Sequence, residues 1–175
     1  MTWTELVSAS AEDAYRVTDG LMSLVSDRDL DWKPQTGTNW MTTGQLLMHL
    51  TNACGFCCQG FVTGDWGMPE GKDAAEMPED EMLPPAEKLP RVASVAEARR
   101  LLAADREIMR RMLAEAGEER LENERSAPPW EPGMERRLGE HLLDMVMHLN
   151  QHKGQLFYYL KLQGKNVNTM HLWRG

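Results

Sequence analysis

One long amphipathic stretch, residues 141–164, constrains the fold of this chain more than any other feature. Its apolar side chains recur mostly at steps of three and four residues, as they do on one face of an α-helix: Leu142, Met145, Leu149, Leu156 and Leu160. A strand would instead alternate apolar and polar residues. We therefore expect a long helix that begins between Glu135 and Leu138 and ends at Gly164.

Three further helices are predicted before this one. Residues 4–25 carry apolar or small side chains at nearly the spacing of a bundle helix. Residues 42–45, Thr-Thr-Gly-Gln, fit a capping box, and the helix that they open is expected to continue to about Val62. Residues 94–97, Ser-Val-Ala-Glu, fit a second capping box, in front of a helix that stops at Gly117.

The remaining segments predict connections. Residues 27–39, 65–90 and 118–134 interrupt the helical periodicity with proline and glycine, and residues 165–175 form a tail without periodicity. Four helices with one long crossover between the second and the third indicate an all-α fold, a four-helix bundle. A length of 175 residues suits one such domain, residues 1–175.

Composition and charge exclude several classes of protein. The net charge is −8, and residues 65–90 alone contain eight acidic residues and two lysines. No basic surface is available for a nucleic-acid backbone, and no apolar run is long enough to cross a bilayer. The first residues lack the basic and apolar regions of a secretory signal, so we expect a cytoplasmic protein. Three cysteines, an odd number, argue against a disulfide framework.

A histidine pair on the last predicted helix suggests a metal site. His148 and His152 are four residues apart, which places both imidazoles on one face within reach of one ion. His141 shares that face, but seven residues put its Cα about 10.5 Å from that of His148, too far to share the ion. His171, in the tail, stays possible. We favour His49, which lies in another helix of the bundle.

The spacing alone leaves two interpretations open, because histidines four residues apart are also common as ordinary bundle side chains. If three neutral imidazoles do bind one ion, at least one coordination position stays open for a solvent molecule or a substrate. Such a ligand set suits zinc, nickel, copper or iron about equally well.

Two separated motifs and the tail carry a family resemblance. Residues 148–164 read His-x-x-x-His-Lys-Gly-Gln-Leu, followed by Tyr-Leu and a closing glycine. This run resembles the last-helix signature of the DinB-like (damage-inducible protein B, YfiT-type) superfamily. Residues 40–53, with a hydrophobic pair before His49, resemble the second-helix motif of the same family, and residues 167–175 resemble its usual ending. Lys153 stands where the family commonly has arginine, so the planar fork of a guanidinium is lost.

The resemblance implies a four-helix bundle that assembles as a homodimer and binds a divalent metal ion, often zinc or nickel, through His49, His148 and His152. It also implies a small-molecule substrate and, as in characterised relatives, an S-transferase that uses a low-molecular-weight thiol such as mycothiol or bacillithiol. The alternative is a non-catalytic, stress-related protein that binds a metal or a small ligand. A third possibility, metal-assisted hydrolysis, requires a carboxylate near the ion.

Three further residues are candidates for the surroundings of the site, and one glycine carries a packing prediction. Gln155 lies on the histidine face and is expected to bond either to a ligand histidine or to an ordinary neighbour. Asp144, one turn before His148, is expected to be a buried polar partner or to orient a ligand. Trp40 would either wall a pocket above the metal or serve as an ordinary core or loop anchor. Gly154, inside a helix, predicts close approach of another backbone.

The cysteines have a spacing that invites a redox interpretation. Cys54 and Cys57 form a Cys-x-x-Cys motif, and Cys58 follows directly. A reactive pair needs the start of a helix, whereas this pair is expected inside the second helix, so we predict buried free thiols. By helical angle only Cys57 could border His49.

Overall fold

The computed structural model describes residues 1–68, 78 and 84–174 of the chain. Within them the elements follow in the order α1 (Trp3–Met22), η1 (Asp27–Asp29), α2 (Thr43–Leu50), α3 (Gly55–Thr63), η3 (Ala86–Lys88), α5 (Val95–Asn123), β1 (Arg125–Ser126), β2 (Arg136–Arg137), α6 (Leu138–Leu162) and α7 (Thr169–Trp173). The η elements are single 3₁₀ turns.

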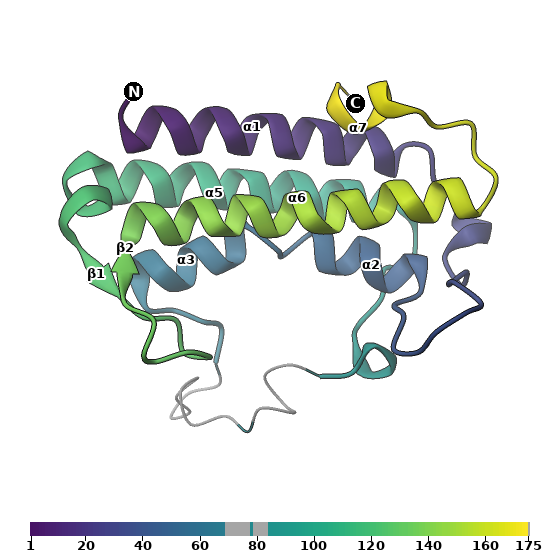
Figure 1. Ribbon diagram of the computed structural model, residues 1–175, viewed down its shortest axis with the longest axis horizontal. Helices are drawn as coiled ribbons and strands as arrows, with labels where there is room; N and C mark the ends of the chain where they lie inside the picture. Colours follow the sequence, from purple (N-terminus) through teal and green to yellow (C-terminus); the bar gives the residue numbers. More distant parts are fainter. Residues whose placement is uncertain (69–77, 79–83, 175) are drawn as a thin grey trace.

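The helices form a four-helix bundle in which two short helices, α2 and α3, together take the place of one long helix. Helices α1, α5 and α6 run along the length of the molecule, and α2 and α3 lie one after the other beside α5 and α6 (Figure 1). Helix α1 packs against both α5 and α6 on the other side. The predicted all-α bundle is therefore confirmed.

The two helices that the predicted crossover joins end and begin where it requires. Helix α3 ends at one end of the bundle and α5 begins at the other (Figure 1). Most of the acidic segment predicted to make this connection, residues 69–77 and 79–83, lies outside the described residues. None of the described helices combines the length and the apolar composition that spanning a bilayer requires.

The second predicted helix differs from the expectation, because the chain makes turns over residues 51–54 between α2 and α3. The capping box at its start is present: the Thr42 hydroxyl accepts from the Gln45 amide, and the Gln45 side chain accepts from the Thr42 amide. The interruption follows from a bond that local sequence does not reveal, since Asp105 of α5 accepts hydrogen bonds from the first amides of α3.

Three smaller features were not predicted. Gly117, the expected end of the third predicted helix, has a non-helical φ of 64°, but helical structure resumes after it and continues to Asn123. Arg125 pairs with Arg137 in a short antiparallel ladder that joins α5 to α6. The tail forms α7, which packs against α1 and α6.

The apolar stripe of α6 forms the centre of the core. Six of its side chains are at most 1% exposed: Leu138, Leu142, Val146, Leu149, Leu156 and Leu160. Burying one such side chain stabilises a fold by about 1.5–3 kcal/mol, so the stripe strongly fixes which face of α6 points inward.

The prediction for Gly154 was wrong. A Cβ atom added there would meet no heavy atom of the described chain within 4 Å. Close packing occurs instead at Gly139, at the start of the same helix, where an added Cβ would lie 2.5 Å from the Trp3 ring and 3.0 Å from the Leu121 carbonyl oxygen.

Replacing Gly139 therefore tests the packing between α1 and α6. We expect Gly139→Ala to lower the free energy of unfolding by about 1–3 kcal/mol, because the added methyl group overpacks the site. Urea unfolding measures the change. Gly133→Ala is the control, since a Cβ there meets nothing within 4 Å. Equal stability of the two variants would contradict the packing.

Candidate metal centre

Three histidine side chains meet between α2 and α6. His49 comes from the last turn of α2, and His148 and His152 come from successive turns of α6. The Nε2 atom of His148 lies 3.2 Å from that of His49 and 3.1 Å from that of His152. One ligand nitrogen from each of the three lies within 4.8 Å of the others. The side chains expected to meet are thus together in the structure.

The other two histidines lie elsewhere. His141, excluded by its distance along the helix, stacks on Phe61 with ring centroids 4.3 Å apart, and its Nε2 atom pairs with the Ser126 carbonyl oxygen at 2.8 Å. His171, which the sequence left possible, contacts Asn168, the residue that caps α7, and is not part of the cluster.

Hydrogen bonds on the far side of two rings orient them. The Nδ1 atom of His148 lies 3.0 Å from the Ala53 carbonyl oxygen, and that of His152 lies 2.9 Å from Oε1 of Gln155. Because a carbonyl oxygen only accepts, each Nδ1 carries the proton and each Nε2 presents a lone pair. This tautomer suits a metal ligand.

A chain of hydrogen bonds extends this support to α2. Gln155 donates to the Tyr159 hydroxyl at 3.3 Å, and Tyr159 donates to the Met41 carbonyl oxygen at 2.9 Å. Met41 immediately precedes the capping residue of the helix that carries His49. Helices α2 and α6 are therefore tied together by the same chain that orients His152.

Burial keeps the three imidazoles neutral. Burial is the main cause that lowers the pKa of His49 to about 4, and the charges of His152 and His148 add to it. Burial also lowers the pKa values of His148 and His152, and for His148 the bond to Ala53 opposes the shift. At neutral pH the cluster therefore offers nitrogen lone pairs rather than cations, as metal binding requires.

The cluster fits a shared ion. In a tetrahedral site with metal–nitrogen bonds of about 2.0–2.1 Å, ligand nitrogens stand about 3.3 Å apart. The separations of 3.1 and 3.2 Å between the Nε2 atoms are close to that value. Lone pairs that face one another at this distance repel, and a cation between them would remove the repulsion. The three residues therefore fit a divalent metal ion.

Asp144 does not orient a histidine. Its carboxylate pairs with Arg136 of β2. Among the described residues it makes no hydrogen bond to His49, His148 or His152, and it is only half-buried rather than buried as expected. Among residues 1–68, 78 and 84–174, no carboxylate groups with the three histidines.

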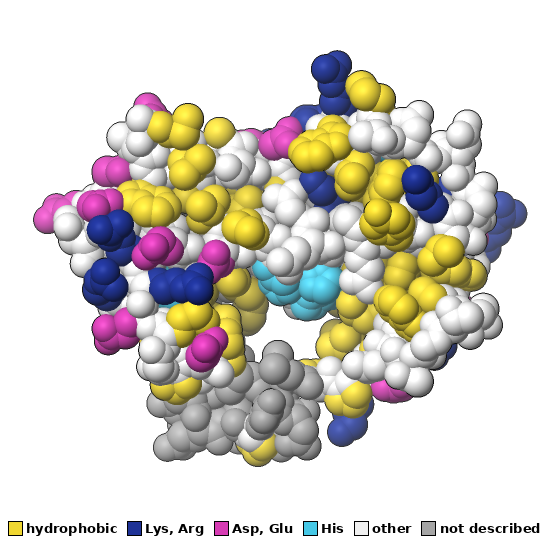
Figure 2. Space-filling view, viewed as in Figure 1, with side chains coloured by type: hydrophobic (Ala, Val, Ile, Leu, Met, Phe, Trp, Pro, Cys, Tyr) yellow, Lys and Arg dark blue, Asp and Glu magenta, His cyan; other side chains and the backbone are white. Residues whose placement is uncertain are grey.

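Trp40 anchors a loop beside the hydrogen-bond chain. Its indole donates to the Thr36 carbonyl oxygen at 2.6 Å, and its ring packs edge-on against Tyr159 with centroids 6.3 Å apart. Of the two expectations, the loop anchor is the one that its contacts support. Figure 2 places the histidine side chains in a hollow with hydrophobic side chains on both sides.

Lys153 has no role at the cluster. Its ammonium group donates to Asn150 at 2.7 Å, and burial lowers its pKa. The lysine that replaces the family's usual arginine therefore makes its hydrogen bond to Asn150 and not to one of the three histidines.

Cys54 lies just before α3, and Cys57 and Cys58 lie in its first turn, rather than well inside one longer helix. Cys54 is the capping residue, so the position expected for the Cys-x-x-Cys motif was wrong. Burial nevertheless raises the pKa of Cys57 to about 12 and that of Cys58 well above its usual value. The thiols are free, as predicted, although Cys57 is only partly buried. The raised pKa values of Cys57 and Cys58 argue against a reactive thiolate at either position.

Two groups that support the histidines were not predicted. Tyr159 lies one turn after Gln155 on the same helix, so its position was open to inference from the sequence. The Ala53 carbonyl is a backbone group without any sequence signature.

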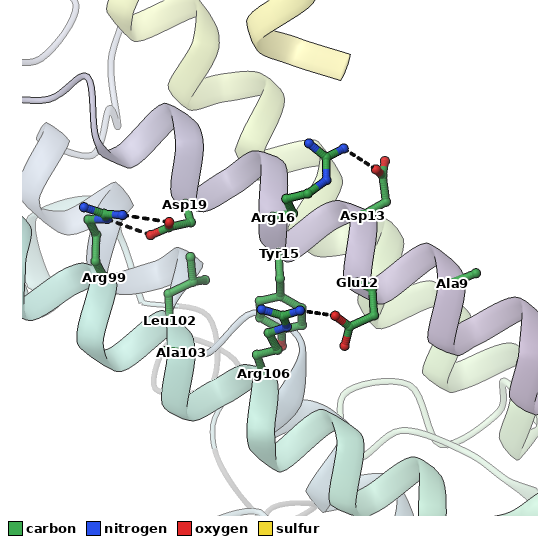
Figure 3. Close-up of a pocket in the computed structure, with 10 residues that line it drawn as sticks. All are labelled: Ala9, Glu12, Asp13, Tyr15, Arg16, Asp19, Arg99, Leu102, Ala103 and Arg106. Atoms are coloured by element: carbon green, nitrogen blue, oxygen red, sulfur yellow. Dashed lines mark hydrogen bonds and ion pairs between the residues drawn. The ribbon is translucent and has the colours of Figure 1, made fainter. Parts of the chain in front are cut away.

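A groove of about 690 Å³ lies between α1 and α5, away from the histidines (Figure 3). Its charged side chains pair with one another, as Arg99 does with Asp19 and Arg106 with Glu12. We therefore base the functional assignment on the histidine cluster.

One of three comparisons with known proteins gave a match. The family model of the DinB superfamily matches residues 10–156, a range that contains all three histidines. Searches among curated proteins and among solved structures found no match. Because the matched range covers most of the 175 residues, the chain belongs to the DinB superfamily.

Proposed function

We propose that residues 1–175 act as one cytoplasmic domain that binds a divalent metal ion, zinc or nickel, through Nε2 of His49, His148 and His152. We further propose that the protein is an S-transferase for a low-molecular-weight thiol. The observation that carries the proposal is the convergence of three neutral imidazole nitrogens from two helices. The three free cysteines agree with a reducing compartment.

The proposed reaction needs little from the protein beyond the ligands. A bound divalent cation with an open position lowers the pKa of a thiol that reaches it and favours the thiolate. The sulfur then bonds to the electrophilic carbon, the leaving group departs with the electrons of its broken bond, and the thiol proton passes to solvent. The histidines stay neutral throughout, and the hydrophobic sides of the hollow suit an apolar electrophile (Figure 2).

Thiol transfer is favoured over hydrolysis by the surroundings of the cluster. A hydrolase needs a base within hydrogen-bond reach of the attacking water. Asp144 is engaged by Arg136, and the described residues bring no carboxylate into the cluster. The non-catalytic alternative, a protein that only stores a metal or a small ligand, shares the same ligands and differs in the absence of product.

Metal content tests the first part of the proposal. We expect protein purified without a histidine tag to bind one zinc or nickel ion per chain, measured by elemental analysis after dialysis. His49→Ala, His148→Ala and His152→Ala should each lower affinity by more than about 100-fold, since even the hydrogen-bond partners of metal ligands are worth about 10–100-fold.

The triple variant should retain no metal, whereas His171→Ala, outside the cluster, should bind as the wild type does. Stoichiometric binding by the triple variant would refute the ligand assignment.

Product formation tests the second part. Metal-loaded protein incubated with monochlorobimane and either mycothiol or bacillithiol should release the fluorescent thioether, and His148→Ala should not. Mass spectrometry of the product confirms the new carbon–sulfur bond. Tight binding of the thiol without any thioether would contradict transfer and favour the storage protein.

We also propose that the protein assembles as a homodimer through the outer face of α6. Met147, Tyr158 and Leu162 are each more than half exposed there, and they lie on one side of the helix. Their burial against a second copy would remove this apolar area from water.

Sedimentation velocity should report a dimer for the wild type and a monomer for the double variant Tyr158→Glu, Leu162→Glu, because two charges in an apolar interface are costly to bury. Thr63→Glu, an exposed change on α3, is the control and should stay dimeric. A wild-type monomer at micromolar concentration would exclude this assembly.

A further inference from the structure

The interruption between α2 and α3 has a direct effect on the metal centre. In an uninterrupted α-helix the Ala53 carbonyl oxygen would accept from the amide of residue 57. Here Cys54 leaves the helical conformation, with φ of −128° and ψ of −70°. The Ala53 carbonyl instead accepts the Nδ1 proton of His148 at 3.0 Å. The break therefore supplies the group that orients one of the three histidines.

A buried carboxylate on α5 accounts for the break. Asp105, only 3% exposed, accepts from the amide of Gly55 at 2.9 Å and from that of Phe56 at 2.8 Å. In a continuous helix these two amides would donate to the carbonyls of residues 51 and 52. The carboxylate takes the place of those carbonyls, and a negative group at the first turn of a helix is also favoured by the helix dipole.

Tyr15 of α1 holds the carboxylate in place. Its hydroxyl donates to Oδ2 of Asp105 at 2.6 Å and lies 3.1 Å from the Gly55 amide. Figure 3 shows Tyr15 extending from α1 toward α5, near the pair of Arg106 and Glu12. Burial raises the pKa of Tyr15, so the hydroxyl stays protonated and remains a donor.

Gly55 is required for this contact. A Cβ atom at this position would lie 2.0 Å from the backbone carbonyl oxygen of Asp105. Any larger residue would push α3 away from α5 and pull its amides off the carboxylate. Three helices therefore contribute one residue each to a junction that is distinct from the histidine cluster.

We propose that Asp105, held by Tyr15, is a positioning residue of the metal centre. It binds the first amides of α3, keeps α2 and α3 separate and leaves the Ala53 carbonyl free to orient His148. The inference rests on the proposed metal binding, because its purpose is to present a ligand nitrogen. In addition, Asp105 should fix the tautomer of His148 in the metal-free protein, before any ion binds.

The test uses two variants of Asp105 and one control. Asp105→Leu removes both acceptors, and Asp105→Asn keeps the shape but leaves one of the two amides without an acceptor. The control, Leu121→Ala, removes a fully buried side chain 16 residues further along α5. It lowers stability without touching the junction.

The first readout is taken without metal, from nitrogen-15 spectra of the imidazoles. The wild type should hold His148 as the Nδ1-protonated tautomer. Asp105→Leu should shift it toward the Nε2-protonated form and speed hydrogen exchange at the Gly55 and Phe56 amides. The second readout is zinc affinity below the unfolding temperature, which should fall about 10–100-fold.

Asp105→Asn should show smaller changes of the same kind, and it decides the matter if Asp105→Leu does not fold. Leu121→Ala should leave the tautomer and the zinc affinity unchanged. Variants of Asp105 that lose stability but keep the wild-type tautomer would overturn the inference. A wild type that binds no zinc, while its tautomer still depends on Asp105, would refute the proposed function and leave the positioning role supported.

Discussion

The burial of the apolar stripe of α6 is the constraint on which the rest of the structure depends. Because Leu149 and Leu156 are fully buried, α6 cannot rotate about its axis without exposing them to water. That fixed rotation directs His148 and His152 toward α2. The histidine cluster is therefore a consequence of hydrophobic packing, and the polar groups around it only refine the direction of each ring.

The hydrogen bonds that orient the rings of His148 and His152 are made to neutral groups. Backbone and amide oxygens accept from the Nδ1 atoms of His148 and His152, and no charged residue among the described ones joins the three histidines. The lowered pKa of His49 has the same origin, since burial disfavours its cationic form. The folded chain thus holds three nitrogen lone pairs close together, where they repel one another unless a cation lies between them. Packing supplies the free energy that keeps them in place.

The sequence predicts the parts of this arrangement that depend on local pattern. The capping box at Thr42, the face shared by His148 and His152 and the long crossover are all readable from short stretches or helical spacing. The interruption before Gly55 was not predicted, because its cause, Asp105, lies 50 residues later in the chain. The Ala53 carbonyl was missed for the same reason. His49 was favoured as the third partner because it lies in another helix of the bundle, and the family motif pointed to the same residue.

The central claim is that three histidine nitrogens hold one ion and leave it an open position. X-ray absorption of the zinc-loaded protein measures the ligand atoms directly. We predict three imidazole nitrogens at about 2.0–2.1 Å, with a light atom completing the coordination. A sulfur ligand at about 2.3 Å in protein free of added thiol, or fewer than three imidazoles, would contradict the claim.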